Sequence, residues 1–209
     1  SAAIGLSFLV SILAFFDLLK LDAHHRIFEL TLFKWIAAGS FTTEIGFQVD
    51  PLSIVMMLVV TGVSFVIHIY SIGYMRTLKE HAQTRFYFSF AVALVGAIGI
   101  AFAANLVTLF IFYEILTIST YPLVAHEESP EAISAGHKYL AYLLTGGLFF
   151  LLAILLTYFL VGTTDFSYQG ILCSALDTTS KTTLQVIFFF FLIGFAKAAW
   201  MPLHSWLPS

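Results

Sequence analysis

The feature that most constrains this chain is a series of apolar runs, each long enough to cross a bilayer as a helix of roughly 20 residues. Lipid cannot satisfy an open backbone, so segments that cross it singly must be helical. Six runs qualify, at 2–19, 52–75, 86–103, 106–124, 133–161 and 184–201. The sequence therefore predicts an all-α integral membrane protein with about six transmembrane helices.

Composition supports this class and excludes several others. Residues are 60% hydrophobic and only 10% charged, whereas soluble domains carry about 25% charged residues. The net charge of −3 gives no reason to expect nucleic acid as a partner. The single Cys173 allows no internal disulfide, and the pair His24-His25 has no partner at the spacing of a metal site. No phosphate loop, dinucleotide motif, serine elbow or HExxH is present, so we expect no catalytic residue, metal or cofactor.

Polar segments separate the runs. The latter half of segment 20–50, at 39–49, alternates polar and apolar residues and predicts a short hairpin outside the bilayer. Asp50-Pro51 predicts a capped start for the second run. The loop 162–183 is expected to hold a short interfacial piece. Positive charge near the helix ends favours a cytoplasmic position for loops 76–85 and 125–132.

Glu114 lies near the middle of the fourth run and is the strongest functional candidate. A carboxylate in hydrocarbon is costly unless it is protonated, paired or hydrated, and such residues mark ion paths. Thr117 and Tyr121 follow at i+3 and i+7 and form a polar stripe with it. The alternative is a protonated glutamate that only joins helices.

Lys197 is the second candidate, late in the sixth run and before Pro202. A lysine there either extends its amine to the interface or pairs inside the bundle. Small neighbours at 194, 196, 198 and 199 favour close packing against other helices. A Lys beside a Glu in low dielectric is a device for proton transfer, because each stabilises the charged form of the other.

Three further residues are weaker candidates for the same path. Lys138, early in the fifth run, is either a relay or an ordinary interfacial anchor. His68 lies within the second run with Ser64 and Ser71 on its face, and is either a proton relay or a packing residue. His204 follows the proline that ends the sixth run, where a broken helix would hold it.

An ordered series of motifs carries a family resemblance. These are FQVDPLS at 47–53, VTGV at 60–63, HIYSIGYM at 68–75, NL at 105–106, YE at 113–114, GFAK at 194–197 and MPLHSWLP at 201–208. From about residue 30 onward the chain resembles the antiporter-like membrane subunits. This family comprises Mrp-type cation/proton antiporter large subunits and the homologous proton-channel subunits of respiratory complex I and membrane-bound hydrogenases.

The resemblance implies that Glu114 and Lys197 form the family's transmembrane Glu–Lys pair, with Lys138 as a further lysine of the proton path. It implies a bundle of two inverted five-helix repeats, each with a broken helix. Residues 1–209 would be a single transmembrane domain of leading helices plus most of the first repeat. The second repeat and the first repeat's broken helix would be absent. A start at Ser1 without a methionine and an end in a linker-like segment agree with an N-terminal fragment.

The stretch after Lys138, 139–147, lacks the Arg and Asp that the largest complex I member tends to carry, which favours the Mrp-type or hydrogenase-associated branch. We therefore expect a proton, or cation/proton, translocating subunit of a multi-subunit complex in the cytoplasmic membrane of a prokaryote. A mitochondrial inner membrane is less favoured. Its partners would be lipid, other hydrophobic subunits, a companion chain with the remaining helices, protons and Na⁺. The alternatives are a pumping subunit of an NADH:quinone oxidoreductase or related redox-driven complex, and a structural anchor without flux.

Overall fold

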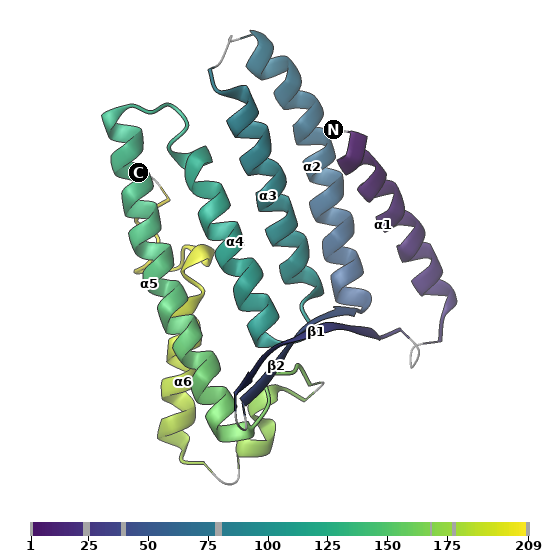
Figure 1. Cartoon of the computed structure of the whole chain (residues 1–209), viewed down its shortest axis with the longest axis vertical. Helices are drawn as coiled ribbons and strands as arrows, with labels where there is room; N and C mark the ends of the chain where they lie inside the picture. The colour runs from purple at the N-terminus through teal and green to yellow at the C-terminus, as the bar shows by residue number, and fades with distance from the viewer. Residues whose placement is uncertain are drawn as a thin grey trace.

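The computed structural model describes residues 2–22, 26–38, 41–77, 81–167, 169–176 and 179–207. His24 and His25 lie outside the described residues. The elements, in chain order, are α1 (Ala2–Lys20), β1 (Phe28–Ala38), β2 (Phe41–Val49), α2 (Pro51–Thr77), α3 (Gln83–Phe102), α4 (Leu106–Val124), α5 (Pro130–Val161), the 3-10 helix η2 (Ile171–Ala175), α6 (Lys181–Gly194) and the 3-10 helix η3 (Ala196–Ala198). Figure 1 shows α1 to α5 side by side in one row, with the hairpin across one end of the row and α6 against α5.

The prediction of a membrane protein with six helices is confirmed for the described part of the chain. Helices α1 to α5 are each long and apolar enough to cross a membrane. Large apolar side chains cover their outer surfaces, as lipid contact requires. The sixth helix has 14 residues, about 21 Å at 1.5 Å per residue, which is less than the roughly 30 Å of hydrocarbon. The predicted end of this helix at residue 201 is wrong, because α6 ends at Gly194.

The all-α prediction omits one element, a two-stranded antiparallel hairpin. Strand β2 falls within the alternating segment that predicts it, but its partner β1 comes from the preceding residues. Side chains on both faces of β1 are exposed, including Phe28, Leu30 and Trp35. Two register irregularities also interrupt its pairing with β2. Residues 28–32 alternate apolar and polar side chains, but the alternation changes phase at Phe33, where the pairing with β2 is irregular, so the strand has no single continuous period.

Asn105 joins the hairpin to the start of α4. Its side-chain oxygen accepts a hydrogen bond from the Thr108 backbone N–H at 2.8 Å, which caps the helix. Its amide nitrogen donates to the backbone carbonyl of Glu44 in β2 at 2.9 Å. The Gly46 backbone N–H donates to the Thr108 hydroxyl at 3.2 Å. One buried side chain therefore ends the turn, starts α4 and holds the hairpin against the bundle.

The predicted cap of the second helix is also present. The Ser53 backbone N–H donates to an Asp50 carboxylate oxygen at 2.7 Å, and the Asp50 N–H donates to the Ser53 hydroxyl at 2.7 Å. Pro51 is the first residue of α2, where its missing N–H costs nothing. The 3-10 helix η2 likewise confirms the short piece expected in the loop 162–183.

At the opposite end of the row, Arg85 connects two loops. It forms an ion pair with Glu128 and donates to the backbone carbonyl of His126 at 2.9 Å. The start of α3 is thereby joined to the turn between α4 and α5. The Arg85 guanidinium holds the pKa of the Glu128 carboxyl below its usual range, through its hydrogen bond first and its charge second.

We predict that Asn105→Ala lowers the free energy of unfolding by about 1–3 kcal/mol, because it removes a helix cap and the shorter of the two side-chain hydrogen bonds to the Glu44 carbonyl. The control is Ser180→Ala, since the Ser180 hydroxyl caps α6 at an exposed position and contacts no hairpin. It should cost about 1 kcal/mol or less. Thermal unfolding of both variants in detergent checks this. Equal losses of stability would contradict a contribution from the hydrogen bond between Asn105 and the hairpin.

We predict that the stabilisation from Arg85 and Glu128 depends on pH. Because the pKa of Glu128 is lowered on folding from its ordinary value of 4.5, the stabilisation is present at neutral pH and is lost as pH falls through the folded value. Glu128→Gln should therefore melt below the native protein at pH 7 and together with it in strong acid. Arg85→Gln should melt lower still and remain below the native protein in acid, because it also removes the hydrogen bond to the His126 carbonyl. The double variant should add no further loss to that of Arg85→Gln. A difference between native and Glu128→Gln that persists in acid would contradict the prediction.

Candidate functional site

The site is built where helix α6 breaks. Its last residue is Gly194, and after Phe195 the chain continues as η3, which carries Lys197. A helix that ends inside the bilayer must find partners for its freed backbone groups. The phenol of Tyr113 donates to the Gly194 carbonyl at 2.8 Å, and the Trp206 indole N–H donates to the Ala196 carbonyl at 3.2 Å. These side chains support the break, after which Lys197 lies half-buried against Tyr113 of α4.

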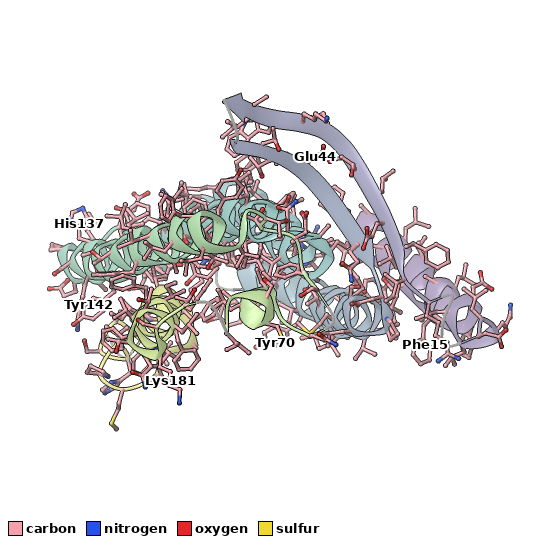
Figure 2. The ribbon with its side chains drawn as sticks, turned by 90° about the horizontal axis from the view of Figure 1, so that it is seen from below. Phe15, Glu44, Tyr70, His137, Tyr142 and Lys181 are labelled. Carbon is pink, nitrogen blue, oxygen red and sulfur yellow. The ribbon has the colours of Figure 1, made fainter. Side chains whose placement is uncertain are left out.

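Glycines bring α5 against the break. A side-chain Cβ at Gly146 would lie 2.9 Å from the Cβ of Ala196, and one at Gly194 would lie 2.7 Å from the Cβ of Phe150. Gly194 and Ala196 are both buried, which confirms the predicted close packing at these two positions. The residues after the break return to the same helix, since the Ser205 hydroxyl donates to the Tyr142 phenol at 2.8 Å. Figure 2 shows Tyr142 on the side of α5 that faces α6 and His137 on the opposite side.

Glu114 faces the middle of α5. A side-chain Cβ at Gly147 would overlap its carboxyl group, so the glycine provides the space that the carboxyl occupies. Among the residues that the structure describes, none is a hydrogen-bond partner of the buried Glu114 oxygen Oε1. Thr117, expected on the same polar stripe, is fully buried, but its hydroxyl donates to the Tyr113 carbonyl at 2.9 Å. An unpartnered acceptor at mid-helix is expensive, and such groups usually have a function.

Lys197 binds the residue next to Glu114. Its ammonium nitrogen donates to the backbone carbonyl of Tyr113 at 2.7 Å and lies 4.0 Å from the centroid of the Tyr113 ring. The described residues show no ion pair within 4.0 Å between Lys197 and Glu114, although the two charges interact electrostatically. The directly paired Glu–Lys arrangement implied by the family resemblance is therefore absent from this structure. The amine instead has a carbonyl and an aromatic face, both of which suit a partly desolvated cation.

The structure does not bring Lys138 to this pair. Lys138 precedes Gly147 by nine residues on α5, which is about 13 Å along the helix axis. It is exposed and lines an open cavity of 490 Å³ with Glu131 and Ser134, at the start of α5. His204 is exposed in the turns after Pro202, where its carbonyl accepts the Leu207 N–H at 3.1 Å.

His68 is buried but lies elsewhere. Its Nδ1 is 3.0 Å from the Ser64 carbonyl, and its ring packs edge-on against Phe90 of α3 at 4.6 Å between centroids. The Ser71 hydroxyl donates to the His68 carbonyl rather than to the ring. Helix α3 stands between α2, which carries His68, and α4 (Figure 1). These contacts are those of a packing residue, the alternative already open for His68.

Two aromatic residues of the site went unrecognised in the sequence. Tyr113 supplies a carbonyl, a ring and a phenol to the break, and Tyr139 of α5 hydrogen-bonds Thr120 of α4 and packs edge-on against Trp206 at 5.4 Å. A usable signal was present, because Tyr and Trp within a span need a partner for their polar atoms. That signal does not say where the partner is, so only the packed helices identify these contacts.

Comparisons with known families agree with this architecture. Residues 35–87 match the family described as NADH-ubiquinone oxidoreductase (complex I), chain 5 N-terminus. Residues 103–209, more than half of the chain, match the family described as NADH:quinone oxidoreductase/Mrp antiporter, TM. The chain belongs to this family.

Individual relatives come from chloroplasts and bacteria. The chain is 31% identical over 213 residues to NAD(P)H-quinone oxidoreductase subunit 5 of the Mesostigma viride chloroplast, covering 100% of this chain and 32% of the relative. It is 31% identical over 193 residues to NADH-quinone oxidoreductase subunit L of Mycobacterium tuberculosis, covering 91% of this chain and 30% of that one. The chain thus spans about a third of the length of the curated relatives it matches.

Two solved structures share the fold of this chain. A chain of the membrane-bound sulfane sulfur reductase, an archaeal respiratory membrane complex, superposes with a TM-score of 0.80 at 25% identity, covering 98% of this chain and 40% of that one. A chain of the Mrp complex from Dietzia superposes with a TM-score of 0.76 at 21% identity, covering 98% and 22%. The second likeness concerns the fold alone.

We predict that Gly147→Ala displaces the Glu114 carboxyl and lowers the free energy of unfolding by about 1–3 kcal/mol, as overpacking does. Gly73→Ala is the matched control, because a Cβ at this helical glycine meets nothing within 4 Å. It should be neutral or stabilising by up to about 1 kcal/mol, since alanine favours helix. Thermal unfolding in detergent separates the two, and equal stability of both variants would contradict the close approach of Glu114 to α5.

Proposed function

We propose that this chain forms part of a proton, or cation/proton, path in an antiporter-like subunit of a multi-subunit membrane complex. One observation carries the proposal. A buried carboxyl oxygen without a described partner and an ammonium group interact electrostatically inside the bundle but do not form an ion pair. Glu114 Oε1 is buried and unpartnered, while Lys197 binds the carbonyl of the adjacent Tyr113. Ionisable residues placed within membrane spans are by default part of an ion path.

The amine of Lys197 has two alternative partners on consecutive residues. One is the Tyr113 carbonyl, which it binds in this structure, and the other is the Glu114 carboxylate. When the amine binds the Tyr113 carbonyl, the Glu114 carboxylate has no ion-pair partner. A buried carboxylate without a counter-charge favours taking up a proton. On the Glu114 carboxylate the two charges stabilise each other, so the carboxyl favours releasing that proton. Movement of a flexible lysine stem between these positions is a small step. It would couple proton uptake and release at Glu114 to the position of Lys197.

The wider assignment follows the family. We place the chain, as a single transmembrane domain made of leading helices and most of a first five-helix repeat, beside other hydrophobic subunits and a companion chain that carries the remaining helices. The interruption of α6 at Gly194 supports a broken helix within this chain, where the resemblance had put it farther on. Lys138 and His204 would belong to continuations of the path toward the surface. We favour a prokaryotic cytoplasmic membrane, with protons and Na⁺ as the transported ions.

A second candidate is a proton-pumping subunit of a redox-driven complex. The similarity to NAD(P)H- and NADH-quinone oxidoreductase subunits favours it. The likeness to a chain of an archaeal respiratory complex favours it as well. Flavin and Fe–S subunits that copurify with the chain would support this candidate, whereas small hydrophobic partners alone would support the antiporter.

We predict that Glu114→Gln and Lys197→Ala each lower proton flux by at least about tenfold, equivalent to roughly 1.4 kcal/mol on the barrier. Flux is measured with a pH-sensitive dye in vesicles from cells whose own gene carries the change. Matched controls are Glu127→Gln and Lys20→Ala, because both side chains are exposed at helix ends. Native flux in Glu114→Gln and Lys197→Ala, with the complex assembled, would instead favour a structural anchor.

A further inference from the structure

Tyr113 contacts the break in α6 in three ways. Its carbonyl accepts the Lys197 ammonium at 2.7 Å, its ring centroid lies 4.0 Å from the same nitrogen, and its phenol donates to the Gly194 carbonyl at 2.8 Å. We propose that Tyr113 is a positioning residue, whose ring holds the amine of Lys197 away from Glu114 and so keeps the pair open. This inference rests on the proposed function. It names the residue that would set how the Lys197 amine divides its time between the Tyr113 carbonyl and the Glu114 carboxylate.

The ring is the part of Tyr113 that a different residue would not supply. Any residue at 113 offers a backbone carbonyl to Lys197. An aromatic face attracts a cation within about 6 Å of its centroid, more strongly when both are removed from water. Tyr113 is 6% exposed, so its face is largely shielded from solvent. The carbonyl and the ring attract the ammonium together, yet neither carries a charge that would neutralise it.

The position of the ring does not depend on the lysine. The phenol is fixed on the Gly194 carbonyl, and the ring packs edge-on against Phe150 of α5 at 5.6 Å between centroids. Contacts with α5 and with the end of α6 therefore hold the ring in place on its own. When the lysine stem moves, it leaves and returns to a surface that stays where it is.

The sequence position of Tyr113 links this surface to Glu114. Consecutive side chains on a helix diverge by about 100°, but Lys197 and Glu114 interact electrostatically, so the carboxyl attracts an amine that leaves the Tyr113 carbonyl. The Tyr113 carbonyl and ring both attract the ammonium away from Glu114, and loss of the ring removes one of these two attractions. The amine then spends more time on the Glu114 carboxylate, and the closed ion pair retains charge that the path has to release.

The test compares Tyr113→Phe with Tyr113→Leu in the assembled complex. Phenylalanine keeps the ring beside Lys197 and loses the phenol, whereas leucine loses both. We expect Tyr113→Leu to lower flux by at least about tenfold. Tyr113→Phe should lower it less, because it keeps the ring beside Lys197 and loses only the phenol bond to the Gly194 carbonyl. Tyr70→Leu on α2 is the control, since Tyr70 is exposed and stacks against Tyr74. It should retain native flux.

A spectroscopic readout separates positioning from a loss of structure. The infrared difference between the native complex and Glu114→Gln isolates the C=O stretch of the protonated Glu114 carboxyl. We expect this band to persist in Tyr113→Phe and to weaken in Tyr113→Leu, with a matching gain of carboxylate absorption as Lys197 pairs with Glu114.

Two results would overturn the inference. One is an unchanged carboxyl band and native flux in Tyr113→Leu. The other is an equal loss in both Tyr113 variants, which would assign the effect to the phenol and the break it supports. Failure of the proposed function is distinct, because it appears as native flux in Glu114→Gln and Lys197→Ala, whatever the infrared band does in the Tyr113 variants.

Discussion

The interruption of α6 at Gly194 is the constraint on which the rest of the site depends. A continuous helix would carry Lys197 onward toward the far membrane surface, where its amine would be hydrated. The break stops the helix short and keeps Lys197 against α4. It persists because the Tyr113 phenol and the Trp206 indole take up the carbonyls that the helix no longer satisfies. The polar ends of two aromatic side chains thus allow a charged residue to be held within the bundle.

The site lies inside the bundle, where ionisable groups must be enclosed by neighbouring helices, and this explains the small residues of α5. Where α5 meets the break and the Glu114 carboxyl, it has Gly146 and Gly147, and larger residues would overlap their neighbours. Close approach keeps Glu114 off the lipid without giving its buried oxygen a fixed partner. A fully satisfied carboxyl would be more stable and would have less reason to exchange a proton. The site therefore combines tight packing of the backbones with an incomplete set of hydrogen bonds at the ionisable groups.

Membership of the antiporter-like family relates the site at Glu114 and Lys197 to a known membrane fold. The chain spans about a third of its curated relatives, and the whole of it follows the fold of a chain from an archaeal respiratory complex. Family resemblance predicted a direct pair of Glu114 and Lys197, which this structure does not contain. It did not reveal that the amine binds the Tyr113 carbonyl rather than the carboxylate, because a motif records which residues occur and not which of two adjacent partners is bound.

Sequence alone determined the membrane class, the six helices and the cap formed by Asp50 and Ser53, because bilayer thickness and helix capping act over short stretches of chain. It did not reveal strand β1, because the alternation of residues 28–32 changes phase at Phe33, where the register with β2 also shifts. The end of α6 was equally hidden, because residues 195–201 are apolar apart from Lys197 and compatible with a longer helix. Only tertiary structure decided where that helix stops and where Lys197 rests, since both depend on groups from α4 and from the segment after the break that lie far away in the sequence.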